Sequence, residues 1–234
     1  MRVLVVTAVA AEADSVAAGL AGPVREARQL PGRYPLSRRA GVDVLTAGVG
    51  PAAAAAGTAT ALATGAYDLV VSAGIGGGFP AHAAVGTLVV ADAIIAADLG
   101  AETPDSYLPV DELGFGRSAH LPPAELAARI AKTLDAVHAP VLTVSTVTGT
   151  AARAAELTRR HPRAAAEAME GFGVAEAAAA HAVPVVEIRA ISNPVGPRDR
   201  AAWRIGQALD SLRYAFQQLA PVLDEEPPHE PTHE

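Results

Sequence analysis

The chain has 234 residues, a length that one α/β domain can reach, and half of its residues are hydrophobic. A formal net charge of -7 argues against a nucleic-acid binder, which needs a basic surface. The lack of cysteine excludes disulfides and thiolate metal sites. The first residues do not form a secretory signal, and no apolar stretch reaches the ~18 residues that span a bilayer. We therefore expect a cytoplasmic protein that binds neither nucleic acid nor membrane.

Short β-branched runs alternate along the chain with longer Ala-rich segments. Strands are predicted at residues 3–7, 42–47, 69–72, 87–92, 141–146 and 185–192. Helices are predicted at residues 10–21, 51–64, 123–137, 150–160, 173–181 and 198–219. In residues 164–169 the Ala and Glu content favours helix, but the position just before a glycine favours the short strand that we predict. This order predicts one domain over residues 1–220, a three-layer α/β/α fold with a mixed, mainly parallel central sheet.

Two segments fall outside this alternation. Residues 99–116 form a polar stretch that contains Pro104, Pro109, Gly114 and Gly116, and so long a loop is usually functional or mobile. Residues 224–234 contain three prolines and five acidic residues, which predicts a disordered acidic tail.

Glycines follow the predicted strand 69–72, in the run Gly74-Ile75-Gly76-Gly77-Gly78. Glycine lets a ligand approach the backbone closely, and ligands of open α/β sheets bind at the carboxyl ends of strands. A tight turn explains the same glycines equally well. A dinucleotide site is disfavoured because the run has no GxGxxG pattern that opens a helix.

Three polar residues stand at ends of predicted elements. Glu12, near the start of the first helix, is either a catalytic carboxylate or a solvated one that suits the helix dipole, and Asp14 competes with it. Glu170 is either a helix-start acid or a ligand for two sugar hydroxyls. Asn193, before Pro194, is either a turn residue or a ligand-binding side chain at the end of a buried strand. The histidines have no metal-ligand spacing, so neither a metal nor another cofactor is expected.

Together these residues resemble the purine nucleoside phosphorylase/nucleosidase superfamily, in its nucleosidase branch, from residue 3 to about residue 219. The resemblance implies that Glu12 activates water and that Met169 and Glu170 bind ribose. It implies further that Ser192 and Asn193 belong to the base-binding strand. The glycine-rich site loop of the family corresponds to Ser72, Gly74, Ile75 and Gly76.

Two departures narrow the resemblance to a subfamily. Methylthioadenosine/S-adenosylhomocysteine nucleosidases have aspartate where this chain has Asn193, and glutamate where it has Ala168. Residues 98–104, 111–116 and 144–150, the last including Gly149, look like those of the futalosine hydrolase family. That resemblance implies release of hypoxanthine from futalosine in menaquinone biosynthesis.

The amide of Asn193 suits this substrate. Its NH₂ can donate to a 6-oxo group while its oxygen accepts from N7–H, whereas a carboxylate only accepts. Hydrolysis rather than phosphorolysis is favoured because no arginine lies between Arg39 and Arg117, around the glycine run. For the benzoate end of futalosine, position alone suggests Arg198 or Arg200 for the carboxylate and Phe172 or Phe115 for the ring.

Two alternatives remain open at this point. One is a nucleosidase or phosphorylase for inosine or methylthioadenosine, and the other is a non-catalytic nucleoside sensor of the same fold. The family resemblance also implies a homo-oligomer whose neighbouring subunit closes the pocket.

Overall fold

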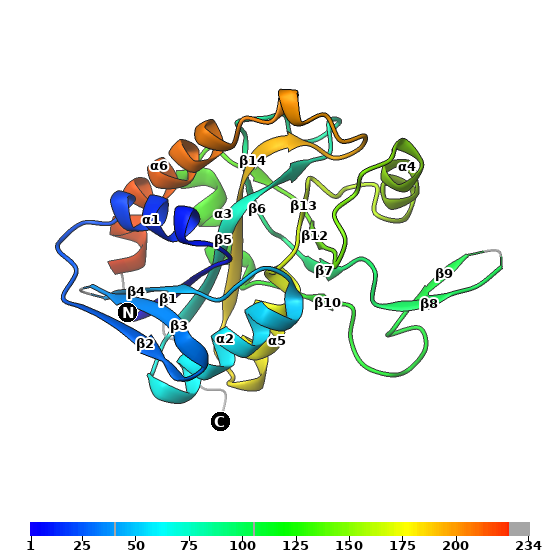
Figure 1. The fold of residues 1–234 in the computed structure, drawn as a ribbon. Coiled ribbons are helices and arrows are strands. Elements are labelled where there is room, and N and C mark those ends of the chain that lie inside the picture. Colours follow the sequence, from blue (N-terminus) through cyan, green and yellow to red (C-terminus); the bar gives the residue numbers. More distant parts are fainter. Residues whose placement is uncertain (40, 105, 225–234) are drawn as a thin grey trace.

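The computed structural model describes residues 1–39, 41–104 and 106–224 (Figure 1). The tail predicted at 224–234 lies outside the described residues except for Asp224, which ends the last helix. Within the described residues, no helix is both long and apolar enough to cross a bilayer.

A mixed, twisted sheet forms the centre of the molecule (Figure 1). Strand β5 (Leu69–Gly78) pairs in parallel with β1 (Val3–Thr7) on one side and with β14 (Val185–Pro194) on the other. Near its end, β5 also pairs antiparallel with β13 (Ala166–Ala168). The remaining strands of this sheet are β2 (Glu26–Leu30), β3 (Tyr34–Arg38), β4 (Val42–Thr46), β6 (Leu88–Val90), β7 (Ile94–Ala96), β10 (Ala119–His120), β11 (Val137–His138) and β12 (Val141–Thr143).

Helices cover both faces of the sheet. One face packs against α1 (Ala10–Gly19), α3 (Ala124–Thr133) and α6 (Ile205–Asp224). The other packs against α2 (Pro51–Thr64) and α5 (Gly171–Ala180), whose small residues allow close approach. A further helix, α4 (Ala151–Arg160), lies near β12 and β13, and Pro31–Arg33 and Arg200–Ala202 form short 3₁₀ turns. The predicted three-layer fold with a mainly parallel sheet is confirmed.

The predicted end of the strand at residue 72 is wrong, because β5 continues through the whole glycine run. Its glycines fit within a crowded strand. A Cβ on Gly78 would lie 2.3 Å from the Ala83 carbonyl oxygen, and one on Gly76 would lie 2.9 Å from that of Glu167. Here glycine serves close packing of backbones rather than a turn.

Several other predicted boundaries also differ from the structure. The helix predicted at residues 123–137 ends at Thr133, and the strand predicted at residues 141–146 ends at Thr143. The polar stretch 99–116 contains a projecting hairpin of β8 (Gly100–Glu102) and β9 (Tyr107–Pro109) (Figure 1). The last helix begins only at Ile205, because Pro197 and the 3₁₀ turn occupy the preceding residues. Strand β14 extends past residue 192 and takes in Asn193, with a register shift after Ile191.

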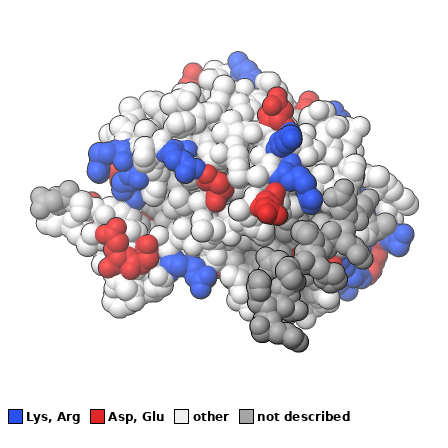
Figure 2. Space-filling view, turned by 180° about the vertical axis from the view of Figure 1, so that it is seen from behind, with Lys and Arg blue, Asp and Glu red and all other residues white. Residues whose placement is uncertain are grey.

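On the face in Figure 2, charges of both signs stand in small separate groups.

Candidate active site

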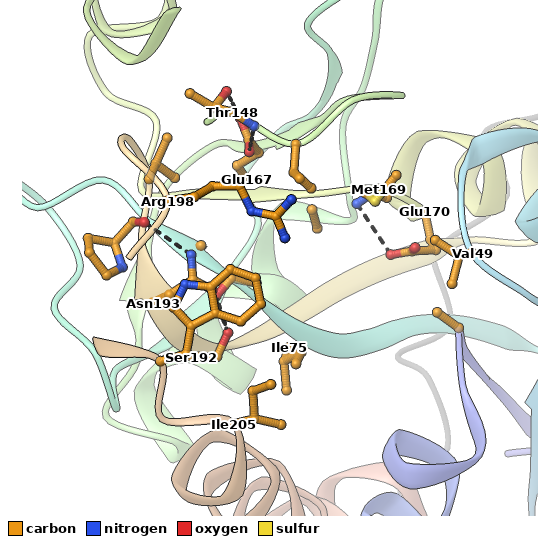
Figure 3. A pocket seen from close by; sticks show the side chains of 18 of the residues that line it. Val49, Ile75, Thr148, Glu167, Met169, Glu170, Ser192, Asn193, Arg198 and Ile205 are labelled. Atoms are coloured by element: carbon orange, nitrogen blue, oxygen red, sulfur yellow. Dashed lines mark hydrogen bonds between the residues drawn. The ribbon is translucent and has the colours of Figure 1, made fainter. Parts of the chain in front are cut away.

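A cavity of about 270 Å³ opens at the carboxyl ends of β1, β5 and β14, beside the junction of β13 and α5 (Figure 3). This is the edge at which parallel sheets bind ligands. Of the predicted site residues, those that line the cavity are Glu12, Ile75, Gly76, Met169, Glu170, Ser192, Asn193 and Arg198.

Glu12 lies in the first turn of α1 and turns back toward the end of β1. One carboxylate oxygen accepts hydrogen bonds from the backbone N–H groups of Ala8 and Val9, at 3.0 and 3.3 Å. The other accepts from the N–H of Ile75 on β5, at 2.9 Å. The side chain is therefore fixed, and Glu12 is only 4% exposed. Asp14, its competitor in the sequence, is exposed to solvent.

Burial raises the pKa of Glu12, while the positive charge of Arg189 and the N–H groups of Ile75 and Ala8 oppose that rise. A buried carboxylate with a raised pKa is a stronger base than a solvated one. Glu12 is thus suited to act as a general base on water.

Glu170 lies at the start of α5, on the other side of the cavity. One of its oxygens accepts from Gly50 N–H at 3.2 Å, and the other from Met169 N–H and the Arg189 guanidinium, both at 3.3 Å. These bonds hold a carboxylate at the cavity wall, where spare lone pairs can accept from ligand hydroxyls.

Arg189 connects the acidic groups of the site. It is 1% exposed on β14, where its Nε donates to Glu187 at 2.8 Å and another nitrogen donates to Ser72 Oγ at 3.1 Å. The surroundings leave no room for a side chain at Gly74, where a Cβ would lie 2.5 Å from Glu12 and 2.7 Å from Arg189. Glu12, Arg189 and Glu170 therefore converge beneath the cavity.

Asn193 lies near the end of β14 and is held by two hydrogen bonds. Its oxygen accepts from Ser192 Oγ at 2.8 Å, and its amide nitrogen donates to the Pro194 carbonyl at 3.0 Å. A flipped amide would set its oxygen against the Pro194 carbonyl, which also only accepts. The donor and acceptor ends of Asn193 are therefore fixed before a ligand binds.

Six residues that the sequence offered for the site do not line the cavity: Ser72, Gly74, Gly149, Phe172, Phe115 and Arg200. Ser72 and Gly74 lie below it, against Arg189. Phe172 is buried with its ring 5.2 Å from that of His120, and a Cβ on Gly149 would meet the aliphatic part of Arg198 at 3.5 Å.

Five further residues of the site were not predicted from the sequence. Two of them, Glu187 and Arg189, support the site from below. The other three line the cavity: Glu167, Thr148 and Trp203. Glu187 and Arg189 could have been predicted as a buried ion pair. They are two charged residues at positions i and i+2 of an apolar strand, so their side chains point to the same buried face. No sequence pattern indicated a role for Glu167, because only the pairing of β13 with its neighbours places this residue at the cavity. Among the described residues, no three His, Asp or Glu side chains gather as a metal site would require.

Comparison with known proteins agrees with this geometry. A family model for the phosphorylase superfamily matches residues 3–224. The chain is also 62% identical to a futalosine hydrolase of Streptomyces coelicolor, over 98% of this chain and 100% of the relative. The chain belongs to the futalosine hydrolase family of the phosphorylase superfamily.

Further members of the family are similar along most of their length. A futalosine hydrolase of Acidothermus cellulolyticus is 49% identical over 92% of this chain and 89% of its own. The solved futalosine hydrolase structure of Helicobacter pylori superposes with a TM-score of 0.79, covering 95% of this chain and 98% of that one. Because the two sequences are only 14% identical, the match to the Helicobacter pylori structure shows a shared fold alone.

Proposed function

We propose that this protein is a nucleosidase that hydrolyses futalosine to hypoxanthine and dehypoxanthine futalosine, in menaquinone biosynthesis. The family to which it belongs supports this activity. The observation that carries it is the convergence of Glu12 and Glu170 on Arg189 beneath one end of a cavity that Asn193 also lines. Such an arrangement separates a place for water and ribose from a place for the base.

Asn193 binds the leaving base. Its oxygen has a second lone pair that accepts from N7–H, and its NH₂ has a second hydrogen for the 6-oxo group. Because its bonds to Ser192 and Pro194 fix the amide, it does not have to reorganise as charge develops on the base.

Glu170 and Met169 hold the sugar. The Glu170 carboxylate accepts from the ribose hydroxyls, with its position set by Gly50 and Arg189. Met169 places an apolar side chain at the same wall. Fixing the ring in this way favours the oxocarbenium-like state that forms as the bond from C1′ to the base breaks.

Glu12 activates the nucleophile. It takes a proton from a water whose oxygen forms the new bond to C1′, while the electrons of the glycosidic bond pass to the base. N7 of the leaving base takes a proton from solvent, and the proton held by Glu12 returns to solvent, so that hypoxanthine leaves as a neutral molecule. General-base assistance of this kind contributes about 10²–10⁴-fold.

The direct test measures base release from futalosine, inosine and methylthioadenosine, each with and without phosphate, by chromatography. We expect hypoxanthine from futalosine at a rate independent of phosphate. Adenine release from methylthioadenosine, or a requirement for phosphate, would contradict the proposal.

The role of Glu12 is tested by Glu12→Gln, with Asp14→Asn on the same helix as the matched control. Glu12→Gln should lower kcat by about 10²–10⁴-fold and preserve binding of hypoxanthine, while Asp14→Asn should keep full activity. Normal turnover by Glu12→Gln would instead favour a protein that only binds nucleosides.

Arg198 is proposed to bind the carboxylate of the benzoate end. It lines the cavity, and its guanidinium lies 5.3 Å from the centre of the Trp203 ring. Arg200 is also near that ring, at 6.0 Å, but does not line the cavity. Arg198→Ala should therefore raise KM for futalosine but not for inosine, and Arg200→Ala should change neither. An equal loss on both substrates would exclude this assignment.

We also propose that the protein is a homo-oligomer. Phe115, 81% exposed, and Leu121, 78% exposed, lie on the segment that follows the β8–β9 hairpin. The proposal takes these two side chains as parts of one apolar patch, because contiguous exposed apolar patches mark contact surfaces. Light scattering coupled to gel filtration should give a multiple of the 23.7 kDa chain mass, and Phe115→Ser should shift it toward the monomer. A wild-type protein that is monomeric at micromolar concentration would exclude the proposal.

A further inference from the structure

Glu167 is a buried carboxylate at the cavity that the mechanism above does not use. It is 5% exposed and lines the cavity from β13. One oxygen accepts from Thr148 N–H at 2.8 Å, and the other accepts from the Thr148 hydroxyl. A carboxylate has about four acceptor positions, so about two remain.

The bonds from Thr148 come from neutral donors, and burial raises the pKa of Glu167 against their effect. A purely structural link to Thr148 would not need a carboxylate, since an amide oxygen accepts from an N–H equally well. A buried acceptor with spare lone pairs at a cavity is best satisfied by a ligand donor.

The sheet places Glu167 opposite Asn193. Gly77 of β5 pairs with Glu167 on one side and with Asn193 on the other. The two side chains therefore rise from strands about 10 Å apart, twice the usual strand spacing. Gly77 lies between them and also lines the cavity. A Cβ on Gly77 would lie 3.0 Å from the Val195 side chain and 3.4 Å from the Asn193 amide nitrogen, so glycine leaves room for both side chains. Figure 3 shows Glu167 beside Thr148 and Asn193 beside Ser192, at separate walls of the cavity.

A planar purine with a hydrogen bond of about 2.9 Å at each edge fits between two side chains that keep about the spacing of their strands. We propose that Glu167 accepts the N1–H of a 6-oxopurine while Asn193 binds O6 and N7, with Thr148 as the positioning residue for Glu167. This assignment rests on the proposed function and extends it: two edges of the base would be recognised, by two different strands.

The consequence is selectivity against 6-aminopurines. Their N1 carries no hydrogen and accepts, so it would face the Glu167 carboxylate with acceptor against acceptor. Sites that hydrogen-bond a particular group penalise analogues that lack it, because buried polar groups then stay unpaired. Asn193 acts at the other edge, and so the effects of the two residues can be measured separately.

The test is calorimetric binding of free hypoxanthine, 1-methylhypoxanthine and adenine to the wild-type protein. The methyl group replaces the N1 hydrogen and leaves O6 and N7 unchanged. We expect 1-methylhypoxanthine and adenine to bind about 10- to 100-fold more weakly than hypoxanthine, the effect of one hydrogen bond to a charged group. Equal binding of hypoxanthine and its 1-methyl derivative would overturn the proposal.

The matched variants are Glu167→Gln and, as control, Glu125→Gln on the exposed start of α3. Glutamine can turn its NH₂ toward N1 of adenine, so Glu167→Gln should narrow the preference for hypoxanthine over adenine about 10-fold, and Glu125→Gln should leave it unchanged. Uniform weakening of all three bases by Glu167→Gln would indicate a structural role and refute the assignment. If Glu167→Gln fails to fold, the comparison of hypoxanthine with 1-methylhypoxanthine on the wild-type protein still tests the proposal. Because binding needs no turnover, a failure here is distinct from a failure to hydrolyse futalosine.

Discussion

Replacing Arg189 by methionine removes the cation that joins the acidic groups of the site. The change keeps a side chain of similar length but leaves Glu187, which is fully buried, without the guanidinium that donates to it at 2.8 Å. Glu170 loses its bond to the same group, and Glu12 loses the positive charge that opposes its burial.

Breaking a buried ion pair by removing one partner costs about 3–5 kcal/mol. For a chain of this size, each kcal/mol lowers Tm by about 2–4 °C, so Arg189→Met should melt roughly 6–20 °C below the wild type at pH 7. Activity should fall as well, because Glu170 is no longer held at the ribose position.

The loss of stability caused by Arg189→Met should be larger at high pH than at low pH. Burial already raises the pKa of Glu187 above its ordinary value of 4.5, and Arg189 opposes that rise. Without Arg189, the folded-state pKa rises further above the unfolded value. The cost is then fully present at pH above the folded-state pKa and is lost as pH falls through it toward 4.5.

The assay is thermal unfolding followed by circular dichroism, at several pH values between 8 and 5. The difference in Tm between Arg189→Met and the wild type should narrow toward pH 5. The double variant Glu187→Met with Arg189→Met should recover part of the stability but not the activity. A variant as stable as the wild type at pH 7, or a deficit that does not change with pH, would refute this account of the buried network.

Three further predictions follow from local geometry. Gly74→Ala should lower kcat about 100-fold, since a Cβ there would lie 2.5 Å from Glu12 and displace it; unchanged kcat would mean that Glu12 is not placed as described. Thr150→Ala removes the side-chain oxygen that accepts from Arg153 N–H at the start of α4. The loss should lower the free energy of unfolding by about 1 kcal/mol and Tm by about 2–4 °C, with kcat/KM unchanged. An unaltered Tm would contradict this prediction. The acid limb of the pH profile of kcat/KM should lie above pH 4.5, because burial raises the pKa of Glu12 and the base must be ionised; a limb at or below 4.5 would exclude Glu12 as that base.

The alternation of β-branched and Ala-rich segments was sufficient to predict the fold class, because it reflects which segments are buried on both faces of a sheet. The first and second helices were recognised for this reason, and so were most of the buried strands. Strand β7 was not predicted, although two of its three residues are buried. The outer strands β2 and β3 and the β8–β9 hairpin were missed, because their polar, partly exposed residues resemble those of loops.

The sequence by itself also determined the chemistry available at the ends of strands, through Glu12, Glu170 and Asn193. Only the tertiary structure decided how these groups are used. It selected Glu12 over Asp14 by turning one into the cavity and the other to solvent, and it joined Glu12 to Glu170 through Arg189. It also placed Glu167 across β5 from Asn193. These relations depend on pairing between strands that are far apart in the chain, and no local pattern of residues records which strands become neighbours.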